Sequence, residues 1–337
     1  MKIAFYFRNV RGGIKAHVDS LSKEFEKRGN GVKKIDQFSL GSYMLGDFYG
    51  LDFSMCRIRE EVKGCDVLHV HHAATFSEFL IPFSEICDEI PVVNTFHIPI
   101  GSSFECALTK MVIVALARLY TNRSKKFISV SAQVAKILRR HSENETVVIP
   151  NGVDIDRFHP KEKDGSKERK TEKKICIGYL GRLSREKNII NMIKAVKMLD
   201  KDSISFKIAG SGPLYNKIKS MEDGRIRVLG YVEDASSFYH SIDVFLLPSK
   251  LEAQPIVLLE AMASGLPIIA TDVGDNEYFI ENNGIFCGTS AKEIREAMEE
   301  ILKEDLKKMG SLSRIKVERE YTWERIAEKT LQVYKTI

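Results

Sequence analysis

The sequence predicts an α/β protein whose two doubly wound, parallel-sheet domains face each other across a cleft. Strand-like and helix-like patterns alternate through the first half of the chain and again through the second half, as parallel sheets require. Between the halves, residues 161–174 are almost wholly charged and lack an apolar period, which indicates a linker. A length of 337 residues accommodates two domains of ordinary size. Two open α/β units joined in this way leave a cleft between their strand ends.

The first half contains six strand candidates, each a short apolar run. They are Lys2–Phe7, Val32–Phe38, Asp66–His72, Pro91–His97, Lys125–Ser131 and Thr146–Asn151. Helical patterns separate most of them. After the first strand, for example, apolar residues from Ile14 to Phe25 form one helical face, and Gly29 ends that helix.

The second half repeats this plan with five strand candidates. They are Ile175–Gly181, Ile204–Gly210, Arg225–Tyr231, Val244–Pro248 and Leu266–Thr271. The last residues, 322–337, form an amphipathic helix that follows another helix, and we expect it to pack back onto the first half. The predicted domains are therefore residues 1–160, completed by the helix at 322–337, and residues 175–321.

Composition limits the class of protein. Hydrophobic residues make up 44% and charged residues 29%, as in soluble globular proteins. Six scattered cysteines suggest reduced thiols and a cytoplasmic protein. The amino terminus lacks the zones of a signal peptide, and no apolar run approaches the ~20 residues that span a bilayer. The net charge of +5 is modest and does not indicate a nucleic-acid partner.

The segment 107–141 is basic and partly apolar. It contains no acidic residue and eight basic ones, namely Lys110, Arg118, Arg123, Lys125, Lys126, Lys136, Arg139 and Arg140. It also contains an apolar helix candidate, Met111–Tyr120, which is too short to cross a membrane. One interpretation is a surface that rests on anionic lipid at the inner face of the membrane. The other is a core helix followed by a solvated basic face.

Two glutamates, Glu252 and Glu260, stand with seven residues between them around a predicted strand-to-helix loop. The helix is predicted over Ile256–Ala263, with Pro255 near its first position. Free amides at a helix start attract phosphate, and the carboxylates beside them accept hydrogen bonds from hydroxyls. A phosphate joined to a polyhydroxylated body is a sugar nucleotide, so this stretch predicts a sugar-nucleotide site.

Two further loops suit the same ligand. The loop that opens the second half carries Arg182 and Lys187, which can reach the crevice and stabilise a leaving diphosphate. After the first strand of the chain, Gly12 and Gly13 permit close approach of the backbone to a phosphate or an acceptor. An ordinary tight turn explains this second loop almost as well.

Other motifs are less specific. The turn Gly210–Pro213 lacks the third glycine of a dinucleotide fingerprint, which argues against a nicotinamide enzyme and leaves either a nucleotide-facing or a purely structural turn. The spacing of His69, His71 and His72 allows a metal, but buried, hydrogen-bonded histidines are the better interpretation because no acidic or cysteine partner is close. The Asp-x-Asp pattern at residues 154–156 favours a turn over a metal site. His97 differs because it ends a strand on the side of the cleft.

Taken together, these stretches resemble the retaining glycosyltransferases of family 4 (group 1), which have the GT-B fold of two Rossmann-like domains. The resemblance covers nearly the whole chain. It rests on the Gly-Gly loop, VIPNGVD (148–154), GRLSREKN (181–188), GSGPL (210–214), EAMASGLP (260–267) and YTWERIAE (321–328). The two-glutamate stretch and GRLSREKN are the specific motifs.

The resemblance implies a role for each matching residue. Arg182 and Lys187 match the diphosphate-binding pair, Glu252 the contact to the donor sugar and Glu260 the contact to the ribose. The amides of Ile256 and Val257 match phosphate contacts. His97 matches the histidine near the reacting sugar, and Gly13 the glycine beside the leaving phosphate. The sequence departs from the family pattern at Ala253–Pro255, where glycines are usual, and at Asp275, which follows Gly274.

The resemblance also implies a reaction. A hexose passes from a UDP- or GDP-linked sugar to an acceptor hydroxyl with retention, and the leaving diphosphate helps to take the acceptor's proton. The catalytic set would be His97, Glu252, Arg182 and Lys187, with no metal and no cofactor. Two alternatives stay open: a sugar-nucleotide epimerase of the same architecture, and a non-catalytic protein that binds a nucleotide sugar. Neither the acceptor nor the sugar follows from the sequence.

Overall fold

The computed structural model describes residues 1–8, 12–36, 55–72, 76–98, 100–101, 104–161, 174–199 and 204–337. The chain forms two compact units. Unit 1 comprises Met1–Gly152 with Trp323–Ile337, and unit 2 comprises Val153–Thr322. Unit 2 thus begins before the predicted boundary at residue 160, because Val153 pairs with Thr322 and Phe158 packs in the core of unit 2. Residues 162–173 of the predicted linker lie outside the described residues.

Unit 1 contains a six-stranded sheet in which neighbouring strands are parallel. In spatial order its strands are β2 (Gly31–Asp36), β1 (Lys2–Phe7), β3 (Val67–His72), β4 (Val92–Phe96), β6 (Lys126–Ser129) and β7 (Thr146–Val148). Each corresponds to a predicted strand. Several strands end before the apolar pattern does, because the following residues turn into the loops at the carboxyl edge of the sheet. A further strand of two residues is β5 (Ile100–Gly101).

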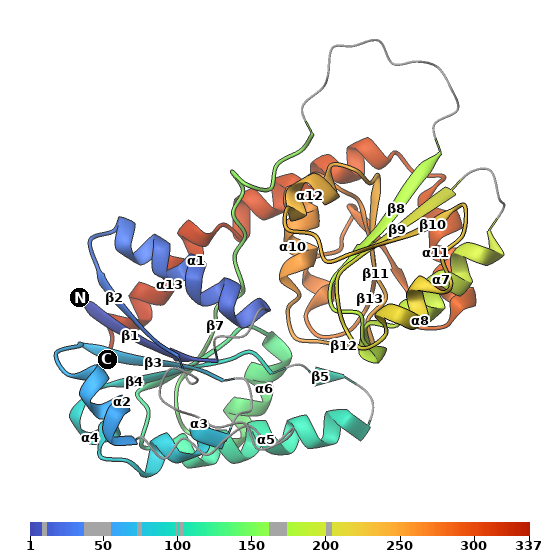
Figure 1. The fold of residues 1–337 in the computed structure, drawn as a ribbon. Coiled ribbons are helices and arrows are strands. Elements are labelled where there is room, and N and C mark those ends of the chain that lie inside the picture. The colour runs from blue at the N-terminus through green and yellow to red at the C-terminus, as the bar shows by residue number, and fades with distance from the viewer. Residues whose placement is uncertain are drawn as a thin grey trace. The chain divides into compact units, whose positions relative to one another are not determined.

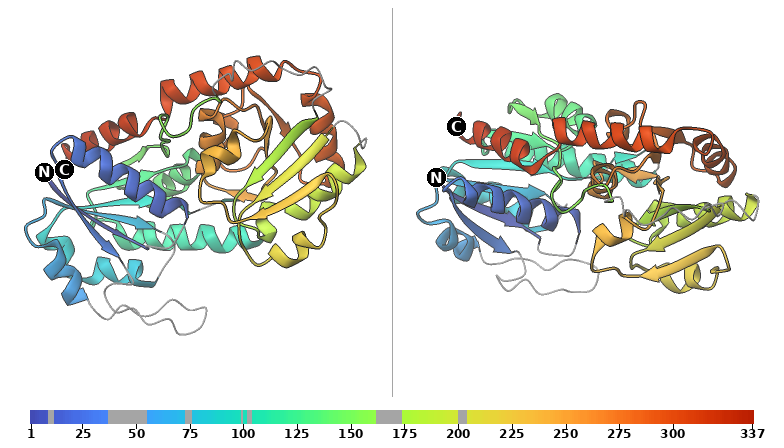
Figure 2. Two further views of the ribbon diagram at one scale, coloured as in Figure 1. Left: turned by 45° about the horizontal axis from the view of Figure 1, so that its top comes forward. Right: turned by 90° about the horizontal axis from the view of Figure 1, so that it is seen from above.

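Helices cover both faces of this sheet (Figure 1). Side chains of β1 alternate, so that Ile3 and Phe5 enter one apolar cluster and Ala4 and Tyr6 enter another. The first cluster lies under α1 (Gly13–Lys27) and α13 (Trp323–Tyr334). The second lies under α2 (Met55–Val62), α3 (Phe76–Leu80), η1 (Ile81–Phe83), α4 (Ile86–Glu89), α5 (Phe104–Tyr120) and α6 (Ala132–His141). Both ends of the chain lie in unit 1 (Figure 2).

Unit 2 contains a second parallel sheet of six strands. In spatial order they are β10 (Ile226–Gly230), β9 (Ile204–Ala209), β8 (Ile175–Leu180), β11 (Val244–Leu247), β13 (Ile268–Thr271) and β14 (Gly284–Cys287). The first five match predicted strands. β14 was not predicted, because its four residues include Gly284 and only a short apolar run.

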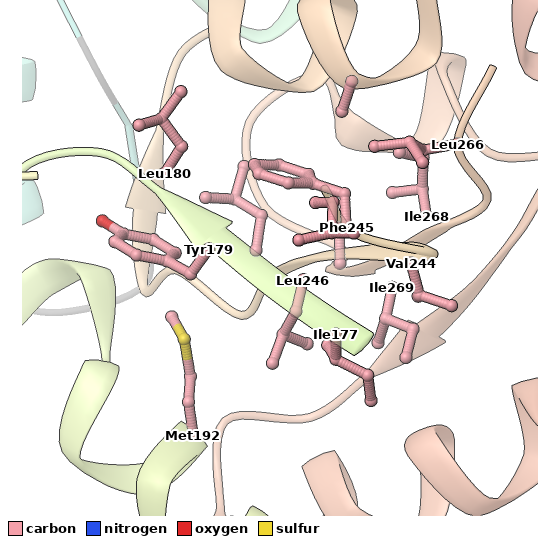
Figure 3. Packing of buried hydrophobic residues seen from close by; sticks show 14 of the residues in the cluster. Ile177, Tyr179, Leu180, Met192, Val244, Phe245, Leu246, Leu266, Ile268 and Ile269 are labelled. Carbon is pink, nitrogen blue, oxygen red and sulfur yellow. The ribbon is translucent and has the colours of Figure 1, made fainter. Parts of the chain in front are cut away.

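The remaining elements of unit 2 are helices and one two-residue strand. They are η2 (Arg185–Lys187), α7 (Ile189–Met198), α8 (Tyr215–Lys219), α9 (Ala235–Tyr239), β12 (Leu251–Glu252), α10 (Ile256–Ala263), η3 (Asn276–Tyr278), α11 (Ala291–Ile301) and α12 (Leu306–Glu320). Figure 3 shows part of the core, in which Tyr179 of β8 and Met192 of α7 lie on one side of the sheet and Phe245 of β11 lies on the other.

Strand order locates the edge at which each sheet can bind a ligand. In unit 2, β8 lies between β9 and β11, so the winding of the chain reverses between β8 and β11. In unit 1 the reversal lies between β1 and β3. Doubly wound sheets bind ligands outside the carboxyl ends of the strands at such a point. Ligand-binding residues are therefore expected in the loops that follow β8 and β11 in unit 2, and in those that follow β1 and β3 in unit 1.

Candidate functional site

The loop after β8 is held in one conformation by a second glycine loop. A Cβ atom at Gly210 would lie 1.8 Å from the carbonyl oxygen of Gly181, so only glycine fits there. The Leu183 N–H donates to the Ser211 carbonyl at 2.8 Å. The Tyr179 hydroxyl donates to the Arg182 carbonyl, also at 2.8 Å. The GSGPL turn therefore has a structural role in supporting the segment that carries Arg182 and Lys187.

Lys187 and Glu252 meet at the carboxyl edge of the sheet in unit 2. Lys187 Nζ lies 2.6 Å from Glu252 Oε1, and the two side chains are 20% and 8% exposed. The main chain brings the loops together, because the Lys250 N–H donates to the Glu186 carbonyl at 2.7 Å. A short, partly buried ion pair thus connects the loop after β8 with the loop after β11.

Arg182 begins the same loop and is exposed. Among the residues that the structure describes, none accepts a hydrogen bond from its guanidinium or forms an ion pair with it. Three further cations, Arg185, Lys217 and Lys250, contribute to a hollow of about 380 Å³ beside η2. A fixed set of cations at this edge favours an anionic ligand, and a guanidinium suits phosphate oxygens in particular.

The loop after β13, which carries Gly274 and Asp275, packs against the backbone of Glu252 and Ala253. Gly274 adopts a φ of +61°, and a Cβ atom there would lie 2.6 Å from the carbonyl oxygens of both Glu252 and Ala253. The Asp275 N–H donates to the Ala253 carbonyl at 3.1 Å, and Asp275 is buried. Asp275, which departs from the family pattern, therefore helps to hold the other departing segment, Ala253–Pro255.

The helix predicted over Ile256–Ala263 has those bounds in the structure. Pro255 precedes it as the N-cap residue with extended dihedral angles, which agrees with its predicted place near the first helical position. No side chain caps this end, and no described residue accepts a hydrogen bond from the N–H of Ile256 or Val257. Two amides at a helix start thus remain available to an anion beside Glu252.

Glu260 lies one turn into α10 and is hydrogen-bonded. The Tyr239 hydroxyl lies 2.9 Å from Glu260 Oε2 and 3.1 Å from the Val257 carbonyl. Burial raises the pKa of Glu260 to about 7, against the opposing effects of the Tyr239 hydrogen bond and the charge of Arg157. A carboxyl with this pKa is an ionised acceptor for only part of its population at neutral pH.

In unit 1, two residues of the predicted site, Gly13 and His97, lie near His17 of α1. Gly13 is the first residue of α1, whose N-cap, Gly12, provides no side chain for capping. His17, one turn later, packs edge-on against His97 with ring centroids 4.8 Å apart. His97 follows β4 directly and is half-buried. Its Nε2 lies 3.0 Å from His71 Nδ1.

The histidines of β3 are buried and hydrogen-bonded, as predicted. His69 contacts Tyr334 of α13 and Thr95 of β4. His72 faces the other side of the sheet, where it contacts Glu78 and Asn94. Burial lowers the pKa of His69 and His71 well below its usual value, so both rings are neutral near pH 7.

Among the described residues, one group of side chains has a geometry that could hold a metal ion. It consists of His17, His71 and His97, with one nitrogen from each within 4.8 Å of the others. This trio differs from the β3 set that the spacing suggested. Asp154 instead forms the predicted turn, since its carboxylate accepts hydrogen bonds from the N–H groups of Asp156 and Arg157.

The basic segment 107–141 covers most of α5 and the whole of β6 and α6. Arg123 forms an ion pair with Asp88 and Lys126 with Glu145. The other basic residues are exposed, namely Lys110, Arg118, Lys125, Lys136, Arg139 and Arg140. Met111 beside them is 68% exposed. Within the described part of the chain, no helix is long and apolar enough to cross a membrane.

Sequence reasoning missed the side chains that position these groups. Tyr179 fixes the loop of Arg182, Tyr239 contacts Glu260, and His71 contacts His97. Asn151 accepts a hydrogen bond from His17 at 2.8 Å, which gives a role to the asparagine of VIPNGVD. The adjacency of two predicted strands could have paired His71 with His97, but no sequence signal connects Tyr239 with Glu260.

Comparison with known families agrees with this geometry. A family model for group 1 glycosyl transferases matches residues 160–316, and one for glycosyltransferase family 4 matches residues 11–157. The chain belongs to this glycosyltransferase family. Its two parallel six-stranded sheets with helices form the GT-B fold.

Two relatives of this glycosyltransferase have named acceptors. The phosphatidyl-myo-inositol mannosyltransferase of Mycobacterium leprae is 26% identical over 365 residues, which cover 98% of this chain and 95% of that enzyme. An Escherichia coli galactosyltransferase, named for UDP-Gal and α-D-GlcNAc-diphosphoundecaprenol, is 26% identical over 247 residues. That match spans 64% of this chain and 60% of the enzyme.

Among solved structures, HepE of Anabaena in complex with UDP-glucose has a TM-score of 0.78 to this glycosyltransferase. The match covers 100% of both chains at 16% sequence identity. At this identity the likeness shows the fold.

Proposed function

We propose that this glycosyltransferase moves a hexose from a UDP- or GDP-linked sugar to an acceptor hydroxyl with retention of anomeric configuration. The observation that carries the proposal is the Lys187–Glu252 pair, 2.6 Å apart at the point where the winding of unit 2 reverses. A nucleotide sugar has hydroxyls directly beside a diphosphate. A carboxylate and a cation in contact are complementary to that arrangement.

The proposed roles follow the order of groups in the donor. Arg182 and Lys187 bind the diphosphate, with the amides of Ile256 and Val257 as further donors. Glu252 accepts hydrogen bonds from the sugar, and Glu260 from the ribose. In unit 1, the resemblance assigns Gly13 to the leaving phosphate and His97 to the reacting sugar.

The chemistry is transfer through an oxocarbenium-like state. As the glycosidic bond breaks, negative charge grows on the diphosphate, and Arg182 and Lys187 stabilise it without a metal. The leaving phosphate oxygen takes the proton of the acceptor hydroxyl. No enzyme nucleophile and no cofactor are part of this proposal.

We further propose a lipid-linked acceptor at the inner face of the membrane. Two observations support it. The names of the two relatives specify a phosphatidylinositol and an undecaprenyl diphosphate acceptor. The exposed basic residues of segment 107–141, with Met111 among them, provide a surface that anionic headgroups would attract.

A transfer assay tests the proposal. The protein is incubated with UDP- or GDP-hexoses and a lipid-diphosphate sugar acceptor in the presence of EDTA, and the product is analysed by NMR. We expect a new glycoside with the anomeric configuration of the donor. A product of inverted configuration, or dependence on added metal, would contradict the mechanism.

The two alternatives give different outcomes in the same assay. An epimerase converts a sugar nucleotide alone into an isomer, and the match to glycosyltransferase families does not favour it. A non-catalytic protein would bind the donor without releasing a nucleoside diphosphate in any mixture.

A further inference from the structure

His71 and His97 share one hydrogen bond. His71 Nδ1 lies 3.0 Å from His97 Nε2. Burial lowers the pKa of both rings well below the usual value, so both are neutral at pH 7. A neutral imidazole carries one N–H, so one ring donates to the other and the contact fixes both tautomers together.

The second nitrogen of His71 decides which ring donates. His71 Nε2 is fully buried and has no hydrogen-bond partner in the described structure. If His97 were the donor, His71 would carry its proton on this nitrogen, which would bury an unpaired N–H. If His71 donates through Nδ1, its Nε2 is left with a lone pair only. Orphaned buried N–H groups are rarer in proteins than under-satisfied acceptors, which favours the second arrangement.

We infer that His71 is a positioning residue that holds His97 in the tautomer with its proton on Nδ1. The nitrogen of His97 that faces away from His71 is then a hydrogen-bond donor. No described residue accepts a hydrogen bond from it, and the His97 side chain is only half-buried. It is therefore available to a ligand oxygen, which under the proposed function is a hydroxyl of the donor sugar.

Packing holds the two rings in place. The His17 ring meets His97 edge-on at an interplanar angle of 78°. His17 is itself fixed by the 2.8 Å hydrogen bond between its Nδ1 and Asn151 Oδ1. On the other side, Phe5 packs edge-on against His71 with centroids 5.2 Å apart. Neither ring is therefore expected to flip and reverse the donor and acceptor.

The same three imidazoles could instead hold a metal, since their nitrogens lie within 4.8 Å of one another. In that case the lone pairs of His71 and His97 would both face the ion, and no proton would lie between them. The two arrangements are mutually exclusive, so one spectroscopic experiment separates them.

NMR of protein labelled with 15N-histidine tests the inference without any substrate. We expect His97 to give the long-range 1H–15N pattern of the tautomer protonated on Nδ1, with and without one equivalent of Zn2+. An Nε2-protonated His97 would overturn the inference, as would stoichiometric Zn2+ binding that shifts the resonances of all three histidines.

Two variants connect the tautomer with the reaction. His71→Phe keeps a ring but removes the donor, and we expect His97 to become a mixture of tautomers. Under the proposed function, kcat/KM then falls about tenfold, as for one lost hydrogen bond. His71→Asn places an amide N–H near the position of Nδ1 and should restore both the single His97 tautomer and the wild-type kcat/KM.

If wild-type NMR shows the expected tautomer but no transfer occurs, the proposed function fails and the inference stands. Equal kcat/KM in His71→Phe and wild type would mean that the tautomer does not serve the reaction.

Discussion

Lys187 Nζ lies 2.6 Å from Glu252 Oε1, although 65 positions separate the two residues in the chain. The contact places a cation and a carboxylate side by side at the carboxyl edge of a parallel sheet. Before a ligand binds, each charge compensates the other, which reduces the cost of keeping both partly buried. A donor that presents hydroxyls to Glu252 and phosphate oxygens to Lys187 would take over both roles.

Lys187→Ala should lower kcat/KM for sugar transfer about a hundredfold or more, since one charge-stabilising contact to the transition state is lost. The reason is electrostatic, so Lys187→Arg should retain part of the activity. Lys197→Ala removes an exposed lysine of α7 and serves as the control with unchanged kinetics. Steady-state kinetics at saturating acceptor measure the effect.

Substitutions in the Lys187–Glu252 pair should affect stability and transfer activity differently. Lys187→Ala leaves Glu252 largely buried without its partner, so urea denaturation should show a loss of about 1 to 3 kcal/mol in the free energy of unfolding. Combining Lys187→Met with Glu252→Gln removes both charges and should restore the stability while transfer stays absent. A double variant with near wild-type activity would exclude both residues from the reaction.

The raised pKa of Glu260 predicts that the free energy of unfolding depends on pH. Its pKa is about 7 in the folded protein and about 4.5 for an unperturbed glutamate, so between these values the folded state binds more protons at this site. Its contribution to stability therefore falls as the pH rises from about 4.5 to 7. Glu260→Gln removes this dependence. Relative to wild type, the variant should gain about 2 kcal/mol between pH 5 and pH 8 by urea denaturation. An equal difference at both pH values would contradict the assignment.

Gly274→Ala should weaken donor binding through the support beneath Glu252. The new Cβ would meet two backbone oxygens at 2.6 Å, at a φ of +61° that disfavours alanine. We expect a stability loss of about 2 kcal/mol or more and a higher KM for the donor. Gly224→Ala is the matched control, since a Cβ there meets nothing within 4 Å. Similar thermal denaturation of the two variants would refute the proposed support.

Charge reversal on α6 tests the membrane surface. Lys136→Glu with Arg140→Glu should weaken sedimentation with anionic vesicles by at least about 30-fold, because each basic residue near such a surface contributes about 1 kcal/mol. Lys307→Glu with Lys308→Glu changes exposed charges on α12 in unit 2 by the same amount and should bind like wild type. Equal partitioning of wild type into neutral and anionic vesicles would favour a solvated basic face.

Much of the fold followed from the sequence because local patterns determine it. Buried parallel strands form continuous apolar runs, so eleven strands were predictable from the chain alone. The helix at Ile256–Ala263 was predictable for a similar reason, since its length, periodicity and preceding proline agree. The gathering of Arg182, Lys187 and Glu252 at one edge required only that parallel strands end on the same side.

The contacts that position the site side chains join residues far apart in the chain, and the sequence did not indicate them. Tyr239 reaches Glu260 from a five-residue helix without a recognisable motif. His71 was assigned to a buried strand, but its contact with His97 depends on the register of β3 against β4. β14 escaped prediction because a four-residue strand that begins with glycine has almost no period.

The most direct test of the central claim is a thermal-shift comparison of wild type and Lys187→Ala with UDP-, GDP- and ADP-hexoses. A ligand at a hundred times its Kd stabilises the folded state by about 2.7 kcal/mol, which corresponds to a rise in Tm of about 5 °C or more. We predict such a rise for wild type with a UDP- or GDP-hexose and none for Lys187→Ala. The absence of any shift with nucleotide sugars, or an equal shift in the variant, would contradict a donor site at Lys187 and Glu252.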